Sequence, residues 1–150
     1  MNYQADVHEF MRVGQQSLPS KQCEDGPLIH RESDQEIKNA ADVQLYMDLI
    51  TEEYNETLTA FKEGDIIEVA DGLADLTWVI MGLANTLGLN FDDIWTEIKR
   101  SNMSKFTNNI IVLDGVTGKI LKPSSYSAPD LEPIIFGKDF EPSAELMTNV

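Results

Sequence analysis

The segment that decides the fold runs from Ile66 to Leu89 and reads IIEVADGLADLTWVIMGLANTLGL. It is apolar on nearly every side, which is typical of a helix buried among other helices. Three carboxylates interrupt it, and at about 100° per residue they share one stripe roughly 60° wide: Glu68, Asp71 and Asp75. Buried carboxylates must be paired, protonated or bound to a metal ion. The segment therefore predicts a buried helix that carries one acidic stripe.

A second acidic cluster precedes this segment. Glu52 and Glu56 stand one helical turn apart, with Glu53 beside them. If the two helices pack face to face, these carboxylates and the stripe on the next helix would line one pocket. Carboxylate oxygens are the ligands of hard divalent cations. The sequence therefore predicts an acid-lined metal site, which is its strongest indication of function.

Capping and helix-breaking residues divide the chain into further elements. We expect an amphipathic helix over 3–16, a loop over 17–34, a long helix over about 34–63, the buried helix over 66–88, a shorter helix over 91–104 and two short strands within 110–122. Gly64 is expected to end the long helix and Asp65 to cap the next one. The proline-containing tail from 123 onward is expected to be largely irregular. The predicted fold class is all-α, a bundle of four to five helices with a short hairpin or turn.

Composition and charge narrow the class of protein. The chain has 150 residues, 42% of them hydrophobic, and a single cysteine, which is typical of one globular domain in a reducing cytoplasm. A net charge of −15 argues against non-specific binding to nucleic acid and to an anionic membrane surface. The N-terminus shows no signal-peptide pattern, and carboxylates and glycines interrupt the apolar segment, so we expect neither secretion nor a membrane span.

The basic residues are unevenly placed. Of 11 Lys and Arg, five follow the acidic segments directly: Lys99, Arg100, Lys105, Lys119 and Lys122. A positive region after a strongly negative one suggests an anionic ligand that metal bridges to the protein. For Lys99 and Arg100 alone, a helix C-terminus favoured by positive charge is an equally good explanation.

The spacing of the acidic residues resembles that of a known family. The order Glu52-Glu53-x-x-Glu56, then Glu68-x-x-Asp71 and Asp75, is similar to the EExxE…ExxD signature of the MazG-like all-α nucleoside triphosphate pyrophosphohydrolases. Three further stretches resemble a compact branch of this family that is found in phages and some bacteria: 74–79, 98–105 and 114–123. This branch is related to dimeric dUTPases and phosphoribosyl-ATP pyrophosphohydrolase. The resemblance covers roughly 5–130 and implies a single domain over 1–150 with its core in that range.

The resemblance implies a chemistry and a set of site residues. Family members cleave a nucleoside triphosphate between its α and β phosphates, giving the monophosphate and pyrophosphate. Mg²⁺, with Mn²⁺ as the alternative, would be held by carboxylates of both clusters: Glu52, Glu53, Glu56, Glu68, Asp71 and Asp75. Glu53 or Glu52 would act as general base or hold the attacking water.

Residues near the C-terminal end would then contact the substrate. Lys105, with Lys122 as second choice, would stabilise phosphate charge, and Asn102 would bind phosphate or ribose. Tyr126 or Phe10 would stack on the base. The identity of the base is left open between dUTP, a canonical deoxynucleotide, a damaged nucleotide and a signalling nucleotide.

One position departs from the family pattern. Relatives with an ELAD segment carry a Glu three residues before the Asp, and Gly72 occupies that slot here. Glu68 or Asp71 would then supply the missing ligand. A degenerate member that binds nucleotide without turning it over is therefore an alternative.

Two further alternatives belong to other classes. A carboxylate-bridged di-iron bundle would need Glu-x-x-His pairs, and no His lies within either cluster. A regulatory or partner-binding helical module without chemistry would explain the acidic faces as solvated surface. Its weakness is the apolar character of Ile66–Leu89.

The apolar residues of the same segment predict an oligomer. They point in too many directions for one partner helix to cover: Trp78, Val79, Ile80, Met81, Leu83 and Leu87. Together with the resemblance, this predicts a homodimer or homotetramer, in the host cytoplasm if the chain is viral.

Overall fold

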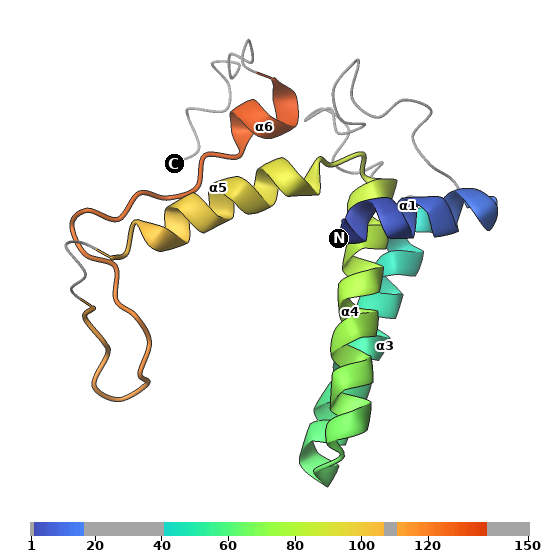
Figure 1. Cartoon of the computed structure of the whole chain (residues 1–150), viewed down its shortest axis with the longest axis horizontal. Helices are drawn as coiled ribbons and strands as arrows, with labels where there is room; N and C mark the ends of the chain where they lie inside the picture. The colour runs from blue at the N-terminus through green and yellow to red at the C-terminus, as the bar shows by residue number, and fades with distance from the viewer. Residues whose placement is uncertain (1, 17–40, 107–110, 138–150) are drawn as a thin grey trace. The chain divides into compact units, whose positions relative to one another are not determined.

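The computed structural model describes residues 2–16, 41–106 and 111–137. These residues form helices α1 (Tyr3–Val13), α3 (Ala41–Glu63), α4 (Ile66–Thr86), α5 (Phe91–Met103) and α6 (Glu132–Phe136), shown in Figure 1. Within the described ranges no β-strand is present, so the predicted all-α fold is confirmed. The predicted loop over 17–34 and the start of the long helix before Ala41 lie outside the described residues.

The helix ends follow the local sequence closely. The Asp65 side chain accepts hydrogen bonds from the backbone N–H groups of Ile67 (3.0 Å) and Glu68 (3.2 Å) and so caps α4. Gly64 has a φ of +77°, a left-handed conformation that costs glycine little, and it ends α3. Both predicted boundaries are confirmed.

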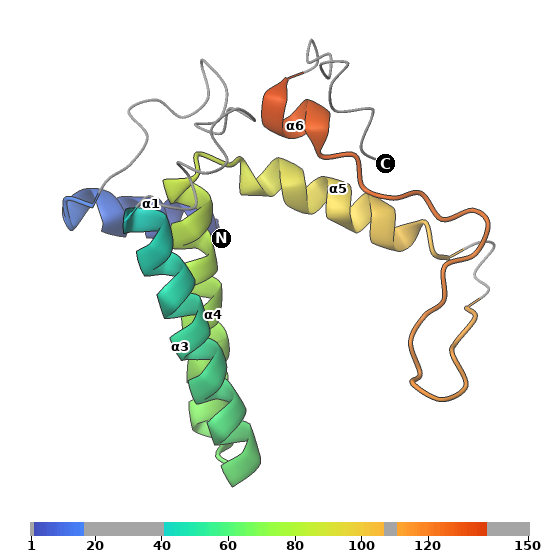
Figure 2. The same cartoon turned by 180° about the vertical axis from the view of Figure 1, so that it is seen from behind.

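The chain divides into two compact units, Met1–Phe91 and Asp92–Val150. In the N-terminal unit, α3 and α4 run side by side in opposite directions, and α1 lies across the end that holds the C-terminal half of α4 (Figures 1 and 2). The hydrophobic core lies at this crossing: Val7, Met11, Tyr46, Val79 and Met81. Gly82 is required there, since a Cβ at this position would overlap the Tyr46 ring.

Polar contacts fix α1 at the crossing. The Gln4 side chain donates to the Leu89 carbonyl (2.7 Å) and accepts from the Phe91 N–H (3.0 Å). The buried Asn85 donates its Nδ2 to the Gln4 carbonyl (3.2 Å). One glutamine therefore holds α1 to the chain that leaves α4.

The prediction that α4 is buried along its whole length is wrong for this unit. Ile66, Ile67 and Leu73 are 74%, 75% and 55% exposed. Among the described residues, α1 reaches only the C-terminal half of α4, so α3 alone covers the first half. Trp78 is also 40% exposed and packs edge-on against Phe10, with ring centroids 5.4 Å apart.

The C-terminal unit contains α5, a turn and α6. In place of the two predicted strands within 110–122, a single antiparallel bridge joins Leu113 and Ile120. The Asp114 side chain accepts from the N–H groups of Val116 (3.1 Å) and Thr117 (2.7 Å) inside the turn. These local bonds close a tight turn, and the backbone bonds from Asp114 N–H to the Lys119 carbonyl and from Leu121 N–H to the Val112 carbonyl join its two arms.

The prediction of a largely irregular tail is wrong at helix α6, whose proline is compatible with a helix start. Pro133 lies in its first turn, where a missing N–H leaves no hydrogen bond unmade. None of the described helices is both long and apolar enough to cross a bilayer.

Candidate functional site

An acidic groove of about 260 Å³ lies between α3 and α4. Residues of both helices line it: Glu53, Glu56, Thr59, Ala60, Glu63, Glu68, Asp71, Gly72 and Asp75. We call this set the acidic groove. The antiparallel pairing of the helices (Figure 2) brings the two clusters of carboxylates together, as the sequence predicted.

The charge of the groove acts most strongly on Glu53. Burial raises the pKa of this carboxyl above its usual value, and the negative charges of Asp75, Glu56, Glu52 and Asp71 raise it further. Glu53 is half-buried, whereas Glu56, Glu68, Asp71 and Asp75 are exposed. Crowded like charges make the groove a place where a cation would bind and where a carboxyl can take up a proton.

Five of the six carboxylates predicted as metal ligands line the groove. Glu52 does not line it and acts on it only through its charge. Glu63 does line it and was missed by the sequence reasoning. Its signal was present, because Glu63 follows Glu56 by seven residues, two helical turns along the same face.

Gly72 explains the departure from the family pattern. It is buried against α3, where a Cβ would overlap the Thr57 hydroxyl. Thr57 itself donates to the Glu53 carbonyl (2.7 Å) and so cannot turn freely away. The helices are therefore too close at this point for a glutamate side chain, while Glu68 and Asp71 line the groove.

The donor set of the groove suits a hard divalent cation. All its charged groups are carboxylates, and Mg²⁺ binds to such sites through one or two of them while keeping several waters. Across the ranges that the structure describes, no three His, Cys, Asp or Glu side chains are gathered closely enough to hold one ion. The chemistry of the groove therefore fits a hydrated ion in an open site better than a closed protein cage.

The predicted substrate-binding residues come together in the C-terminal unit. Lys105 Nζ donates to Asn102 Oδ1 (2.8 Å), and Lys122 Nζ lies 4.6 Å from the centroid of the Tyr126 ring. The hydrogen bond from Ser101, followed by the charges of Lys122 and Lys105, lowers the pKa of the Tyr126 phenol. We call Asn102, Lys105, Lys122 and Tyr126 the cationic cluster.

This arrangement bears on the predicted base stacking. Lys122 covers one face of the Tyr126 ring, so a base could stack only on the other face unless the lysine moves. The other candidate, Phe10, packs against Trp78 in the N-terminal unit.

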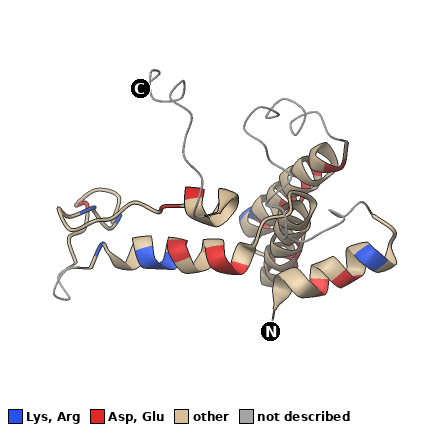
Figure 3. Cartoon of the chain, turned by 90° about the horizontal axis from the view of Figure 1, so that it is seen from above, with Lys and Arg blue, Asp and Glu red and all other residues tan. Residues whose placement is uncertain are grey.

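Charge is also ordered along α5. Asp92 and Asp93 stand in its first turn and Arg100 in its last, which matches the helix dipole at both ends (Figure 3). The dipole explanation for Arg100 is thus consistent with its position, and Arg100 also pairs with Glu97.

Two comparisons with known proteins bear on this site. The chain is 31% identical over 77 residues to the uncharacterized protein L479 of Acanthamoeba polyphaga mimivirus, a match that covers 50% of this chain and 31% of that protein. The chain thus spans about a third of the length of this relative. Residues 27–102, just over half of the chain, match the family model of phosphoribosyl-ATP pyrophosphohydrolase, and the whole acidic groove lies inside this range. The chain therefore belongs to the phosphoribosyl-ATP pyrophosphohydrolase family, within the MazG-like all-α superfamily.

Proposed function

We propose that this protein is a metal-dependent pyrophosphohydrolase that converts nucleoside or deoxynucleoside triphosphates to the monophosphate and pyrophosphate. Its role would be control or cleaning of the nucleotide pool. The observation that carries the proposal is the acidic groove, in which burial and then the charges of neighbouring carboxylates raise the pKa of Glu53.

The groove residues divide into two roles in this proposal. Glu56, Glu68, Asp71 and Asp75 would hold a hydrated Mg²⁺, with Mn²⁺ as the alternative, one or two of them directly and the others through its waters. A bound divalent ion neutralises phosphate charge and makes a nearby water more acidic. Glu53 accepts the proton of the attacking water, because a raised pKa brings a carboxyl closer to the range in which a general base works. Glu52 supports this role through its charge, with no place of its own in the groove.

The reaction in this scheme is a balanced hydrolysis. One water is consumed, the anhydride bridge between the α and β phosphates breaks, and the monophosphate and pyrophosphate leave separately. The proton of the water passes first to the Glu53 carboxylate and then to solvent.

The cationic cluster is proposed as a phosphate-binding site of the C-terminal unit. Lys105 and Asn102 are already joined by a hydrogen bond at the end of α5, so one ligand oxygen can meet both. Lys122 supplies a second ammonium group, held over Tyr126. The base would stack on the face of the Tyr126 ring opposite Lys122 or contact other residues.

A homodimer or homotetramer also belongs to the proposal. Val79 and Met81 are two of the apolar residues from which an oligomer was predicted, and both are buried inside the N-terminal unit. The most exposed apolar residues of α3 and α4 are Phe61 (72%), Ile66 (74%) and Ile67 (75%), at the opposite end of the pair, and Trp78 is 40% exposed. Light scattering at micromolar concentration should give at least twice the 16.8 kDa of one chain, and a mass of one chain would contradict the oligomer.

The experiment that tests the function is a substrate panel with and without metal. Pyrophosphate release would be measured for every ribo- and deoxynucleoside triphosphate, for dUTP, for an oxidised nucleotide and for phosphoribosyl-ATP, each in Mg²⁺ and in excess chelator. We expect release from at least one substrate in Mg²⁺ and none in chelator. Saturable nucleotide binding without release would instead support a non-catalytic binding module.

A further inference from the structure

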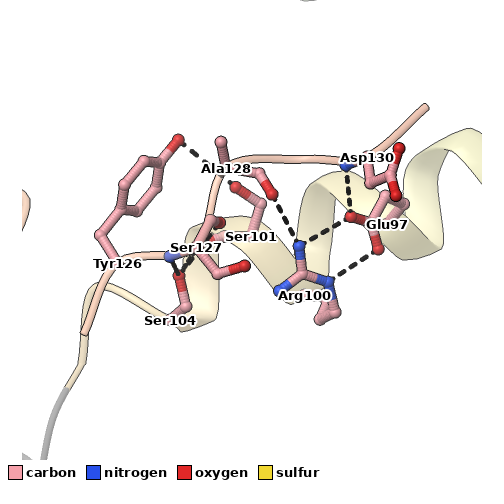
Figure 4. A network of polar contacts seen from close by, with 8 residues as sticks. All are labelled: Glu97, Arg100, Ser101, Ser104, Tyr126, Ser127, Ala128 and Asp130. Atoms are coloured by element: carbon pink, nitrogen blue, oxygen red, sulfur yellow. Dashed lines mark hydrogen bonds and ion pairs between the residues drawn. The ribbon is translucent and has the colours of Figure 1, made fainter. Parts of the chain in front are cut away.

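Two side chains of α5, together with that of Ser104 just after it, hold residues 125–130 against the helix (Figure 4). Ser104 Oγ accepts from the Ser127 N–H (2.8 Å), Arg100 Nη2 donates to the Ala128 carbonyl (2.9 Å), and Glu97 Oε1 accepts from the Asp130 N–H (2.7 Å). We call residues 125–130 the strap. Since every one of these bonds reaches the strap's backbone, they fix where the strap lies along α5 whatever its side chains are.

The Glu97–Arg100 pair gives this attachment its geometry. Arg100 donates through Nε to Glu97 Oε2 and through Nη2 to Glu97 Oε1, both at 2.7 Å. The two groups therefore form a planar fork, which fixes orientation as well as distance. Arg100 and the Asp130 N–H lower the pKa of Glu97 to about 2. Both ends of the fork are thus engaged with the strap.

Tyr126 is part of the strap, and its ring contacts the ammonium group of Lys122. The buried Ser101 donates from Oγ to the Tyr126 hydroxyl (3.5 Å), which places the phenol over the last turn of α5. Lys122 Nζ lies over the face of the same ring. Lys105 follows α5 directly and bonds Asn102 on its last turn. The position of the strap on α5 therefore decides whether the two lysines stand together.

We propose that Arg100 and Ser104 are positioning residues that hold the strap so that Lys122 and Lys105 form one two-lysine site for a polyphosphate anion. The proposal rests on the proposed function for the identity of the anion. It also assigns a role to three residues that bind no ligand in the proposed function. These are Arg100, Ser101 and Ser104 of the run Arg100-Ser101-Asn102-Met103-Ser104-Lys105, and all three contact the strap.

The phenol of Tyr126 reports on this arrangement without any substrate. Its pKa is lowered by Ser101, Lys122 and Lys105, whereas that of the buried Tyr46 is raised by burial and by Asp42. In an ultraviolet titration of the full chain, the tyrosine that ionises at the lowest pH should disappear in Tyr126→Phe. That variant assigns the signal.

The strap variants must leave the charge near Tyr126 unchanged. Arg100 and Tyr126 interact through their charges, so Arg100→Lys is chosen because it keeps the charge and loses the fork. Ser104→Ala removes the bond to Ser127 without touching any charge, and Ser104→Thr retains a hydroxyl. Lys99→Gln is the matched control, a charge removed from the exposed surface of the same helix.

We expect the Tyr126 titration to move up toward 10 in Arg100→Lys and in Ser104→Ala, and to stay in place in Ser104→Thr and Lys99→Gln. In the active enzyme, the first two variants should lower kcat about tenfold, within the hundredfold that an ångström of misplacement can cost, with KM changed less. Unchanged titration in both variants would overturn the proposal, and so would moved titration with unchanged kcat.

A failure of the proposed function gives a different result. If wild-type protein hydrolysed no substrate of the panel, binding of inorganic pyrophosphate would be measured by calorimetry in place of kcat. Weaker binding in Arg100→Lys and Ser104→Ala than in Lys99→Gln would support the two-lysine site. Equal binding in all three would overturn it.

Discussion

The acidic groove gathers like charges, whereas the charged groups in and around the cationic cluster are paired. The residues that line the groove include five carboxylates of the two predicted clusters and no basic side chain, and burial, followed by the neighbouring negative charges, raises the pKa of Glu53. In the C-terminal unit, Glu97 is paired with Arg100, Lys105 with Asn102 and Lys122 with Tyr126. There the pKa values of Glu97 and Tyr126 are lowered.

This difference indicates which region is organised without a ligand and which would be stabilised by a bound cation. The cationic cluster is held together by its own hydrogen bonds, so it is organised before any ligand arrives. Among the described residues, no basic side chain lines the groove to neutralise its negative charge, so a divalent cation would relieve the repulsion. The predictions below test each side of this contrast.

The largest effect is expected from neutralising one carboxylate of the groove. Glu53→Gln should lower turnover by about a hundredfold to ten-thousandfold, the range that a general base contributes. Asp75→Asn should also abolish turnover, through loss of a metal-holding carboxylate. Steady-state kinetics in Mg²⁺ measures both.

Asp48→Asn is the matched control for these variants. Asp48 lies on α3 outside the groove, where it accepts from Gln44 (2.7 Å). It should keep wild-type turnover. If all three variants lost activity equally, the loss would reflect the general charge of α3 and α4, and the assigned role of the groove would be wrong.

The next largest effect concerns the cationic cluster. Lys105→Ala should lower kcat for every accepted nucleotide by a similar factor, between about tenfold and a thousandfold, because the lysine stabilises charge that develops on the phosphates. Lys99→Ala, on helix α5 that precedes Lys105, should change little. A Lys105→Ala enzyme that lost one nucleotide and kept another would place Lys105 in base recognition.

The close contact beneath the groove predicts a loss of stability. Gly72→Ala should lower the free energy of unfolding by about 1–3 kcal/mol, because the new Cβ overlaps the Thr57 hydroxyl and forces α3 and α4 apart. Chemical denaturation measures the change. Thr57→Ala removes the overlapping atom, so the double variant Gly72→Ala/Thr57→Ala should lose less stability than the two single changes added together.

These variants also show how much of the molecule could be predicted from its sequence. The boundary at Gly64 and Asp65 depends on local chemistry, so the sequence was enough to predict it. Helical spacing predicted five of the carboxylates that line the acidic groove, on the assumption that the two helices pack face to face. Exposure of Ile66 and Ile67 did not, because burial depends on how far α1 reaches along α4.

Contacts between segments that are distant in the sequence could not be predicted either. The overlap that a side chain at Gly72 would make with Thr57 depends on how closely α3 and α4 approach. The strap is held through backbone groups, which leave no pattern in the side-chain sequence. Both features needed the three-dimensional structure.

A smaller effect follows from the raised pKa of Glu53. Below its ordinary pKa of 4.5 this carboxyl is protonated in the folded and unfolded states alike, and it costs the fold nothing. As the pH rises through the higher folded-state pKa, the charged carboxylate destabilises the fold. In chelator at pH 7, Glu53→Gln should therefore have a higher Tm than wild type, and the difference should vanish below pH 4.5.

The smallest effect has the opposite sign and lies in the other unit. The pKa of Glu97 is lowered from 4.5 to about 2, so its contribution to stability is present above pH 4.5 and is lost as the pH falls through 2. Glu97→Gln should slightly lower Tm at pH 7. Thermal scans that gave both variants the same sign would remove the contrast between the two regions.

The most direct test of the account is phosphorus NMR of a nucleoside triphosphate incubated with the protein, in Mg²⁺ and in excess chelator. The account predicts that the monophosphate and intact pyrophosphate appear together in Mg²⁺, and that neither appears in chelator. Full activity in chelator, or a diphosphate and orthophosphate as the first products, would contradict it.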